Sequence, residues 1–437
     1  MTRLWQGIDW SAAGRRMHDR IADLFPVCRS ITGDGLRETL RRLSRDLPLT
    51  LREVPSGTKV FDWTVPPEWN VRDAWVADPS GRRVIDFQRS NLHVMGYSVP
   101  VRARMRLDEL KTHLYSIPEH PDWIPYKTSY YAERWGFCLP HRELLALPDV
   151  EYDVCIDATL EPGSLTYGEC LIGGDTTDEI LVSCHVCHPS LANDNLSGAV
   201  VAAALAAQLR TVPHRYSYRF LFIPGTIGSI TWLALHEDEV ARIKHGLVLA
   251  NLGDAGAPTY KRSRRGVAEI DRAAAHVLRT RGGAHAIEEF SPYGYDERQY
   301  CSPGFDLPVG CLMRTPHGRF VEYHTSADNL DFVHGEQLAD SLAMCLEILE
   351  ALEGNRAYVN LNPKCEPQLG KRGLYRTMGG RVEGGGFDEM AMLWVLNLSD
   401  GRHSLLDIAE RSGQRFDALC AAADALREHA LIAEANA

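Results

Sequence analysis

The spacing of hydrophobic residues divides the chain into segments of different character. Near the N-terminus, hydrophobic residues recur every three or four positions, at Met17, Ile21 and Leu24 and again at Leu36, Leu40 and Leu43. This spacing places them on one face of a helix. A turn-rich stretch, Ser30–Gly35, separates the two groups. We therefore predict two helices between about residues 10 and 47, and we assign residues 1–50 to a helical part of the main domain.

From residue 49 to about 161 the pattern changes to short stretches interrupted by many prolines, and most of the tryptophans lie here. Alternation of hydrophobic and polar positions is typical of strands with one buried face. The predicted strands are Leu51–Val54, Ala74–Ala77, Arg83–Phe87 and Asp153–Asp157. We interpret residues 51–162 as an inserted β-rich domain. The alternative is a set of long loops that decorates the main domain.

Between about residues 165 and 352, hydrophobic runs typical of buried strands alternate with longer helical patterns. This alternation predicts a mostly parallel sheet, and we assign residues 163–356 to this domain. The expected strands are Ile180–Cys184, Tyr218–Ile223, Gly246–Ala250 and Val309–Met313. The expected helices are Leu196–Leu209, Ile230–Glu239, Glu269–Thr280 and Gly335–Leu352. The first of these helices is apolar on nearly every face, so it should pack against the sheet.

The last part of the chain, residues 357–437, returns to helical patterns after a segment rich in proline and glycine. Helices are predicted near Phe387–Leu398, Ser404–Ser412 and Arg415–Glu428. The arrangement resembles a winged helix. Its second helix has too few basic residues for typical DNA recognition, so we favour a packing or dimerising role, which makes a homo-oligomer one interpretation.

Composition and charge exclude several classes of protein. The 437 residues are 45% hydrophobic and 24% charged, and no stretch approaches the roughly 20 apolar residues that span a bilayer. The first residues show no secretory signal, so we expect a cytoplasmic protein. A net charge of −11 argues against nucleic-acid binding. The basic run Lys261–Arg265 is interpreted as a solvated loop, with a clamp for a carboxylate or phosphate as the alternative.

The eleven cysteines are scattered along the chain, and we expect them to be reduced thiols. Cys184 and Cys187 form a C-x-x-C pair that would suit a redox site. The histidines beside them favour a metal site instead.

Two distant segments contain the residues most suited to chemistry. The first, Ser183–Gly198, reads SCHVCHPSLANDNLSG and follows an apolar strand, and the second, Glu322–Asn329, reads EYHTSADN. Polar residues at the carboxyl end of a parallel strand lie where α/β folds bind their ligands. Imidazole and carboxylate groups are good zinc ligands, and catalytic zinc usually keeps three protein ligands and an open position. Together the segments predict a metal site.

These segments resemble those of the co-catalytic zinc aminopeptidases, whose pattern is His-x-Asp after a strand, an Asp-Asn-x-Ser-Gly turn, and a final His-Thr-x-x-Asp. Over nearly its full length the chain is similar to a bacterial aminopeptidase-like family with an inserted β domain and a C-terminal winged helix. A third matching motif reads PGTIGSITWL. The resemblance implies an aminopeptidase-like (phosphorylase/hydrolase-like) α/β fold, with a mostly parallel sheet and helices on both faces.

The resemblance also implies a set of metal ligands. His185 matches the first histidine ligand, Asp194 the bridging aspartate and His324 the final histidine. Asp254 lies near the position of the family's further carboxylate ligand, and Asn251 is the alternative for that place. The cofactor implied is one or two Zn²⁺ ions.

Two positions depart from the pattern of the aminopeptidases. Cys187 stands where an aspartate is expected, with His188 beside it as a replacement ligand, so either His185 or His188 could be the first ligand. Pro224 and Gly225 stand where the family has two adjacent glutamates, a general base and a ligand. The usual group that takes a proton from zinc-bound water is therefore missing.

Other residues could replace that base. Glu322 is two residues before His324, on the same side of an extended segment, and is the first candidate. Its alternative role is a salt bridge, or a hydrogen bond that orients His324. Asp296 and Glu297 follow, in a loop that resembles the one lining the family's substrate pocket. Tyr323 is a candidate for stabilising an oxyanion.

We therefore expect a zinc-dependent hydrolase that cleaves an amide or peptide bond in a small molecule or short peptide. The resemblance makes a substrate from polysaccharide or specialised-metabolite biosynthesis as plausible as a peptide. The alternative is a non-hydrolytic protein that keeps the metal and binds a small molecule.

Overall fold

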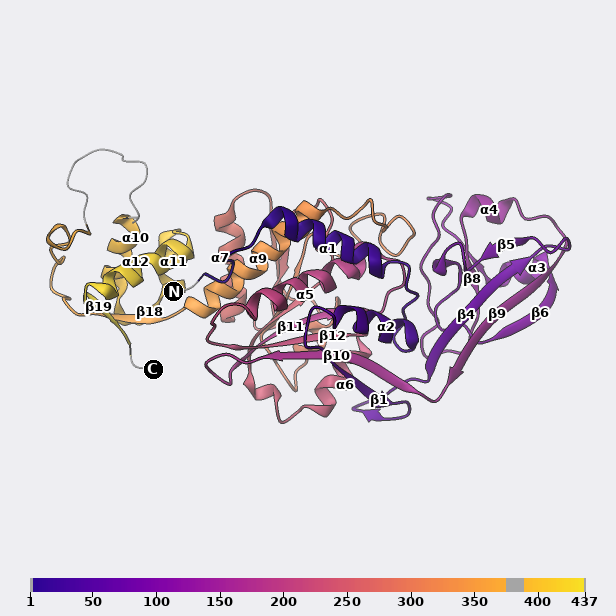
Figure 1. Ribbon diagram of the computed structural model, residues 1–437, viewed down its shortest axis with the longest axis horizontal. Coiled ribbons are helices and arrows are strands. Elements are labelled where there is room, and N and C mark those ends of the chain that lie inside the picture. Colours follow the sequence, from indigo (N-terminus) through magenta and orange to yellow (C-terminus); the bar gives the residue numbers. More distant parts are fainter. Residues whose placement is uncertain (1–2, 375–388, 436–437) are drawn as a thin grey trace.

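The computed structural model describes residues 3–374 and 389–435. The molecule is elongated, with a central α/β part between a β-rich unit at one end and a small C-terminal unit at the other (Figure 1). The N-terminus lies beside the C-terminal unit, far from the β-rich unit (Figure 1). The chain therefore crosses the central part several times.

The central part is built on one eight-stranded sheet in the order β1-β10-β12-β11-β13-β16-β14-β15. The four inner strands β12, β11, β13 and β16 run parallel, while β1, β10 and β14 pair antiparallel with their inner neighbours. The strands are β1 (Thr50–Pro55), β10 (Ser164–Ile172), β11 (Glu179–His185), β12 (Ser217–Ile223), β13 (Ile243–Leu249), β14 (Thr259–Lys261), β15 (Ala286–Glu288) and β16 (Val309–Met313).

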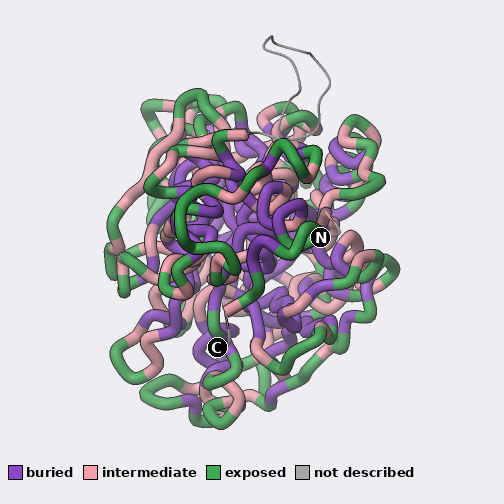
Figure 2. Tube along the Cα trace, turned by 90° about the vertical axis from the view of Figure 1, so that its left-hand side faces the viewer, coloured by how far each residue is buried: buried purple, intermediate pink, exposed green. Residues whose placement is uncertain are grey.

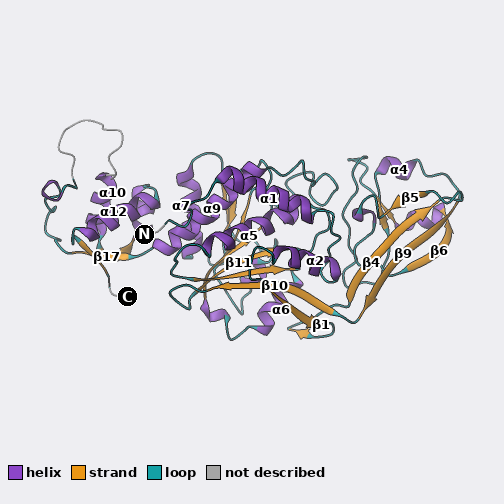
Figure 3. Cartoon of the chain, viewed as in Figure 1, coloured by secondary structure: helices purple, strands orange, loops and turns teal. Residues whose placement is uncertain are grey.

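Helices cover both faces of this sheet. The helices are α1 (Trp10–Leu24), α2 (Asp34–Leu43), α5 (Gly198–Leu209), α6 (Ile227–Leu235), α7 (Glu269–Arg281), α8 (Glu297–Tyr300) and α9 (Gly335–Gly354). Helices α1, α5 and α9 lie on one face, and α6 lies on the other (Figure 3). Along β11, Ile180 and Val182 belong to the core on the α5 side, whereas Leu181 belongs to the core on the α6 side. Successive side chains of a strand point to opposite faces, so both sides of β11 are apolar.

In the central part, α5 and α6 begin at other residues than predicted. The regular helix α5 begins at Gly198, because residues Ala192–Ser197 form an irregular turn before it. Helix α6 spans Ile227–Leu235, whereas we expected Ile230–Glu239. Its first turn forms directly after Pro224, whose carbonyl accepts the N–H of Gly228. The acidic residues that follow Leu235 would lie at a helix C-terminus, where negative charge is unfavourable.

The β-rich unit contains a four-stranded antiparallel sheet in the order β5-β4-β9-β6. Its strands are β4 (Glu68–Ala77), β5 (Arg83–Asp86), β6 (Val101–Arg106) and β9 (Glu151–Glu161). The smaller elements are the hairpin β2 (Lys59–Val60) and β3 (Trp63–Thr64), the pair β7 (Leu114–Tyr115) and β8 (Phe137–Cys138), and helices α3 (Leu107–Leu110) and α4 (His141–Leu145). The strand expected at Leu51–Val54 is part of β1 and joins the large sheet through β10 instead. The pairing partner of a strand can lie far away in the sequence, so the local pattern could not show which sheet this strand joins.

In its described residues the C-terminal unit combines a three-stranded sheet, β18-β17-β19, with three α-helices. Its elements are β17 (Ala357–Asn360), α10 (Glu389–Leu398), β18 (Asp400–Ser404), α11 (Leu405–Ser412), α12 (Phe416–Glu428) and β19 (Ile432–Glu434). The first two residues of the helix predicted at Phe387–Leu398 lie outside the described residues. Arg272 of α7 pairs with Asp407 and Glu410 of α11, which fixes this unit to the central part.

Buried residues fill the interior, while exposed ones concentrate on the outer loops (Figure 2). The core on the α5 side continues into the C-terminal unit through Leu405 and Leu426, and the core on the α6 side continues into the β-rich unit through Trp69 and Tyr152. Among the described residues, no helix has both the length and the hydrophobicity to cross a membrane.

Candidate metal centre

The candidate site lies where three neighbouring parallel strands end. His185 is the last residue of β11, Pro224 follows the end of β12, and Asn251 comes two residues after β13. Because these strands are parallel, their carboxyl ends meet at one edge of the sheet. The sequence-predicted ligands gather at this edge.

Asp194 stands at the centre of a cluster of three histidines. Its Oδ1 lies 2.9 Å from Nε2 of His185, and its Oδ2 lies 2.9 Å from Nε2 of His324. Nδ1 of His188 lies 3.7 Å from the same Oδ2. Ligand atoms of His185, His188 and Asp194 all lie within 4.8 Å of one another. The structure therefore brings together four of the five predicted metal ligands, and both histidines of the His185–His188 segment reach the cluster.

The cluster is buried, and burial together with the facing side chains sets its protonation. The Asp194 side chain has no exposed surface, and that of His324, the most open member, is 34% exposed. Burial by itself would raise the pKa of Asp194, but the imidazoles around it hold that pKa well below its usual range. Burial also lowers the pKa of His188 to about 3. A carboxylate and a neutral imidazole are the forms in which these side chains bind a metal.

The loop that carries Asp194 is held by the asparagines on either side of it. Asn195 donates from Nδ2 to the carbonyl of Leu249 at 2.9 Å and accepts the N–H of Asn251 at 3.1 Å. Asn193 accepts the N–H of Gly253 at 2.9 Å. These bonds replace those of a regular helix turn and tie the loop to the end of β13. The asparagines of the NDN motif thus explain why the regular helix begins only afterwards.

The structure does not bring Asp254, the fifth predicted ligand, to the cluster. Its Oδ1 accepts from Oγ1 of Thr315 at 2.5 Å, and its Oδ2 accepts from Nδ2 of Asn193 at 3.0 Å. Asn251, the alternative, is fully buried and donates to the hydroxyl of Tyr295 at 2.8 Å. Its Oδ1 has no hydrogen-bond partner among the described residues. Asn251 therefore has an oxygen available to a ligand, whereas both oxygens of Asp254 are used within the fold.

A carboxylate from another segment lies beside Gly225. A Cβ atom at Gly225 would lie 3.3 Å from Oδ2 of Asp296 and 3.1 Å from Cβ of His185. Ser229 donates to Oδ1 of Asp296 at 2.7 Å, while Oδ2 has no hydrogen-bond partner among the described residues. Burial raises the pKa of Asp296 to about 6. A buried carboxyl group with one free oxygen thus lies beside the cluster.

The other candidate bases are placed less favourably. Within residues 3–374 and 389–435, the Glu322 carboxylate makes neither a hydrogen bond nor an ion pair, so the salt bridge considered as its alternative role is not formed there. Glu297 is buried and accepts from Nζ of Lys261 at 2.8 Å. Lys261 is thus part of a buried ion pair and does not belong to a solvated loop. Tyr323 stacks on His324 with ring centroids 3.9 Å apart, and burial raises its pKa, so the hydroxyl stays protonated.

Cys187 lies in the same region but is unsuited to redox chemistry. It is buried, and burial raises the pKa of its thiol to about 12. Its Sγ contacts the carbonyl of Gly225 at 3.9 Å. A reactive cysteine needs an exposed, stabilised thiolate, and both Cys184 and Cys187 are buried free thiols.

The β-rich unit closes one side of the cluster. The N–H of Tyr126 donates to the carbonyl of His324 at 2.8 Å, and Ser326 donates to the carbonyl of Ile124 at 2.8 Å. The Tyr126 ring meets the rings of His188 and His324 edge-on, at 5.2 and 5.1 Å. The segment around Tyr126 is therefore part of the site.

Sequence reasoning missed Tyr126, Tyr295 and Asp328. Tyr295 stacks on His185 with centroids 4.9 Å apart, and Asp328 accepts the N–H groups of Asn193 and Asp194. Asp328 stands in the matched His-Thr-x-x-Asp motif, which was a usable signal. Tyr126 lies in a proline-rich loop with no pattern of its own.

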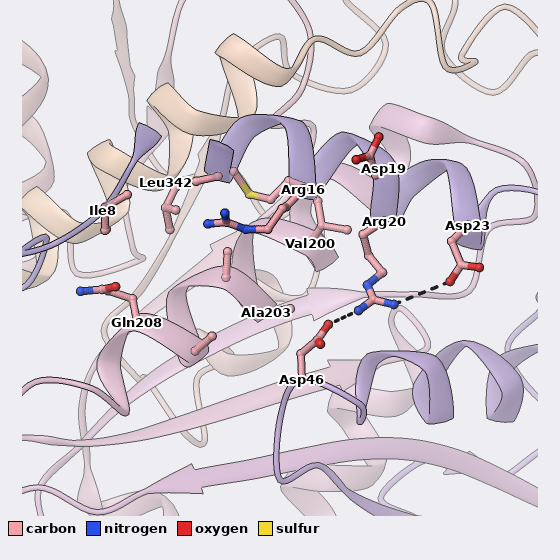
Figure 4. A pocket seen from close by; sticks show the side chains of 14 residues that line it. Ile8, Arg16, Asp19, Arg20, Asp23, Asp46, Val200, Ala203, Gln208 and Leu342 are labelled. Atoms are coloured by element: carbon pink, nitrogen blue, oxygen red, sulfur yellow. Dashed lines mark hydrogen bonds and ion pairs between the residues drawn. The ribbon is translucent and has the colours of Figure 1, made fainter. Parts of the chain in front are cut away.

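A separate cavity of about 590 Å³ lies between α1 and α5 (Figure 4). Arg20 of α1, which lines it, pairs with Asp23 of the same helix and with Asp46 (Figure 4). None of the predicted site residues lines it. The candidate chemistry and this cavity are therefore separate features.

Comparison with known proteins assigns the chain to families. Residues 18–355 match the model of a domain of unknown function, DUF4910, and residues 356–434 match a winged helix-turn-helix model. A protein of Clostridium acetobutylicum named "Putative polysaccharide biosynthesis protein with aminopeptidase-like domain" is 54% identical over 416 residues, which are 95% of each chain.

Solved structures agree with this assignment. A crystal structure described as a "putative peptidase" from Clostridium acetobutylicum has a TM-score of 0.93 at 51% identity, covering 98% of this chain and 97% of the other. A zinc aminopeptidase from Bacillus subtilis has a TM-score of 0.57 at 12% identity, covering 78% of this chain and 95% of the other. The predicted α/β fold with aminopeptidase-like and winged-helix parts is thus confirmed.

Proposed function

The chain belongs to the DUF4910 family and has an aminopeptidase-like fold, and we propose that it is a zinc-dependent hydrolase cleaving an amide or peptide bond in a small substrate. The observation that carries this proposal is the buried cluster of His185, His188, Asp194 and His324. His324 and Asp194 are 130 residues apart in the chain, yet their side chains are in contact. A metal centre explains why these four side chains meet.

The chemistry of the cluster fits zinc. Three imidazoles and one carboxylate form a donor set that Zn²⁺ binds well. Nδ1 of His188 is buried without a hydrogen-bond partner among the described residues, which is costly unless a ligand occupies it. Asn251 binds the hydroxyl of Tyr295, which stacks on His185, and with its free Oδ1 we include it as a further oxygen donor. When bound, zinc would supply Lewis-acid polarisation of a carbonyl and acidify a water molecule.

Asp296 is the residue we assign to proton transfer. A general base must lie within hydrogen-bond reach of its proton, and its pKa should lie near the working pH. Asp296 has a free Oδ2 close to His185, and burial raises its pKa to about 6. Ser229 fixes the other oxygen, so the carboxylate cannot turn freely. Asp296 would accept the proton of the attacking water and return it to the leaving amine.

The tyrosines around the cluster would orient the substrate and exclude water. Tyr295 and Tyr126 lie against the imidazoles of His185 and His324, and Tyr323 stacks on His324 from its own segment. The protonated hydroxyl of Tyr323 could donate to an oxyanion, which keeps its predicted role. Aromatic side chains buried on one edge and open on another suit the mouth of a pocket.

The substrate is proposed to be small, or the end of a short peptide. The segment Ile124–Tyr126 of the β-rich unit covers one side of the cluster, which leaves little room for a folded protein. The relative from Clostridium acetobutylicum is named for polysaccharide biosynthesis, which makes an acylated amino sugar as suitable a candidate as an aminoacyl amide.

Metal analysis combined with hydrolysis tests this function. Protein purified without chelator should contain zinc, and it should release product from a panel of aminoacyl p-nitroanilides and N-acylated amino sugars. Removal of zinc with a chelator should abolish that release, and added zinc should restore it. Protein that contains no zinc and takes up none would contradict the proposal.

A non-hydrolytic binding protein is the second candidate, because Pro224 and Gly225 stand where related enzymes have their glutamates. This candidate requires that zinc is bound and that no member of the panel is hydrolysed. Substrate analogues would then bind without turnover, and substitution of Asp296 would leave their affinity unchanged.

A further inference from the structure

Asp328 joins the two segments that supply the candidate ligands. Its Oδ1 accepts the N–H of Asn193 at 2.6 Å, and its Oδ2 accepts the N–H of Asp194 at 2.9 Å. Its main-chain carbonyl accepts the N–H of Ala192 at 3.0 Å. Three successive N–H groups of the Asp194 loop therefore bind one residue of the His324 turn.

Two of these contacts engage both oxygens of a fully buried carboxyl group. The Asp328 side chain has 0% exposure, and no arginine or lysine pairs with it among the described residues. A buried carboxylate without a cation is costly unless its oxygens accept hydrogen bonds. Here the N–H groups of an irregular loop supply them, so carboxylate and loop depend on each other.

The opposite side of the same turn is held by other contacts. Oγ of Ser326 accepts the N–H of Ile124 at 2.9 Å, and the carbonyl of His324 accepts the N–H of Tyr126 at 2.8 Å. The turn is thus fixed to the β-rich unit on one side and to the Asp194 loop on the other. Asp328 lies four residues after His324, and its hydrogen bonds link the turn that carries His324 to the backbone of the Asp194 loop.

We propose that Asp328 is a positioning residue that sets the placement of Asp194 relative to His324, so that zinc binding depends on it. This inference rests on the proposed zinc site. Asp328 supplies no atom to the cluster of His185, His188 and Asp194, so it acts through the loop. The backbone of Asp194 is fixed by this carboxylate, while its side chain remains available to the histidines.

The expected size of the effect follows from residues that orient metal ligands in other proteins. Loss of such a residue typically lowers metal affinity by roughly 10- to 100-fold. In Asp328→Asn one oxygen becomes an NH₂ group facing a backbone N–H, so one hydrogen bond is lost while volume is kept. Zinc affinity should fall within that range, and the increase in melting temperature on adding zinc should become smaller.

Ser326→Ala provides the matched control. It removes a hydrogen bond of similar length from the same turn, on the side that faces Ile124. This variant should have a lower melting temperature without zinc but unchanged zinc affinity. A residue with only a structural role would lower the melting temperature in the same way and leave zinc affinity alone.

The experiment measures zinc dissociation constants by competition with a chromogenic chelator, and melting temperatures with and without zinc, on the full chain. If the wild type and Asp328→Asn bind zinc with equal affinity, this inference is wrong. It is also wrong if Ser326→Ala lowers zinc affinity as much as Asp328→Asn does. Either result leaves the proposed function standing. A wild type that binds no zinc overturns the proposed function as well. Should Asp328→Asn fail to fold, Asp328→Glu, which keeps the carboxyl group but moves it by one methylene, is measured instead and is held to the same outcomes.

Discussion

The two halves of the candidate site follow their family pattern to different degrees. The ligand half, with His185, Asp194 and His324, keeps the motif of the aminopeptidases, and the structure gathers these residues around one carboxylate. In the proposed proton-transfer half, Pro224 and Gly225 stand where the aminopeptidase pattern has two glutamates, and Asp296 from a different segment lies beside Gly225. Metal binding needs several atoms at fixed mutual distances, whereas a base must reach only one proton. A residue at another position in the chain can therefore supply a general base more easily than it can replace a metal ligand.

The carboxylates of the two halves also differ in the direction in which their pKa values are displaced. Asp194 and Asp296 are both buried, yet their pKa values are displaced in opposite directions. The imidazoles hold the pKa of Asp194 well below its usual range, against the effect of burial, whereas burial raises the pKa of Asp296 to about 6. One carboxylate is suited to hold a cation and the other to exchange a proton.

Substitution of the ligand half should have the largest effect. Asp194→Ala removes the group that all three histidines face, so zinc affinity should fall by more than the roughly 100-fold seen for indirect ligand partners. Hydrolysis should disappear with the metal. Zinc content by elemental analysis and release of p-nitroaniline check this outcome. Hydrolysis that survives at wild-type rate would show that the cluster is not the catalytic centre.

The second largest effect should come from a substitution that impairs proton transfer and leaves metal binding intact. Asp296→Asn keeps the shape of the side chain but cannot accept a proton, so kcat should fall by roughly 10²- to 10⁴-fold. Zinc affinity should remain that of the wild type, because Asp296 is not a ligand in the proposed site.

Asp306→Asn is the matched control for Asp296→Asn. Asp306 lies in the following loop and pairs with Arg264 and Arg265 at the surface. Its loss should leave kcat unchanged. If Asp296→Asn retained full kcat, the same substitution strategy would be applied to Glu322, whose carboxylate makes no hydrogen bond or ion pair in the described part of the chain.

A smaller effect is expected from filling the place of the lost glutamate. Gly225→Ala would put a methyl group 3.3 Å from Oδ2 of Asp296 and 3.1 Å from Cβ of His185. Overpacking of this kind costs about 1–3 kcal/mol of stability, and displacement of the carboxylate should lower kcat by about tenfold. Thermal unfolding and steady-state kinetics measure the two effects.

Gly173→Ala serves as the comparison, because a Cβ there has no heavy atom within 4 Å. It should change neither kcat nor stability by a measurable amount. If Gly225→Ala had the same kcat and the same stability as Gly173→Ala, Asp296 would not be held close to Gly225.

The smallest effect on zinc should come from Asp254. Asp254→Asn weakens bonds to Thr315 and Asn193, so we expect a loss of about 1–3 kcal/mol in the free energy of unfolding with little change in zinc affinity. Asn251→Ala should weaken zinc binding more than Asp254→Asn does. The reverse order, measured by chelator competition, would restore Asp254 as the further ligand.

Local patterns accounted for the elements with continuous hydrophobic runs. The strand predicted at Val309–Met313 has the observed limits of β16, and the helix predicted at Glu269–Thr280 differs from α7 by one residue. Errors arose where the outcome depended on distant partners. The strand at Leu51–Val54 pairs with β10, far along the chain, and α6 begins early because of the turn at Pro224. The predicted domain limits, the absence of nucleic-acid binding and the oligomeric state stay predictions.

The sequence by itself determined the α/β fold, the two candidate ligand segments and the absence of glutamate at Pro224 and Gly225, because local periodicity and residue type are enough to identify them. Only the tertiary structure decided that His185 and His188 both reach Asp194, that Asp254 does not, and that Asp296 lies beside Gly225. It also revealed the part played by Tyr126 and Asp328. Distances between segments remote in the chain are set by packing of the whole domain, and no local pattern contains them.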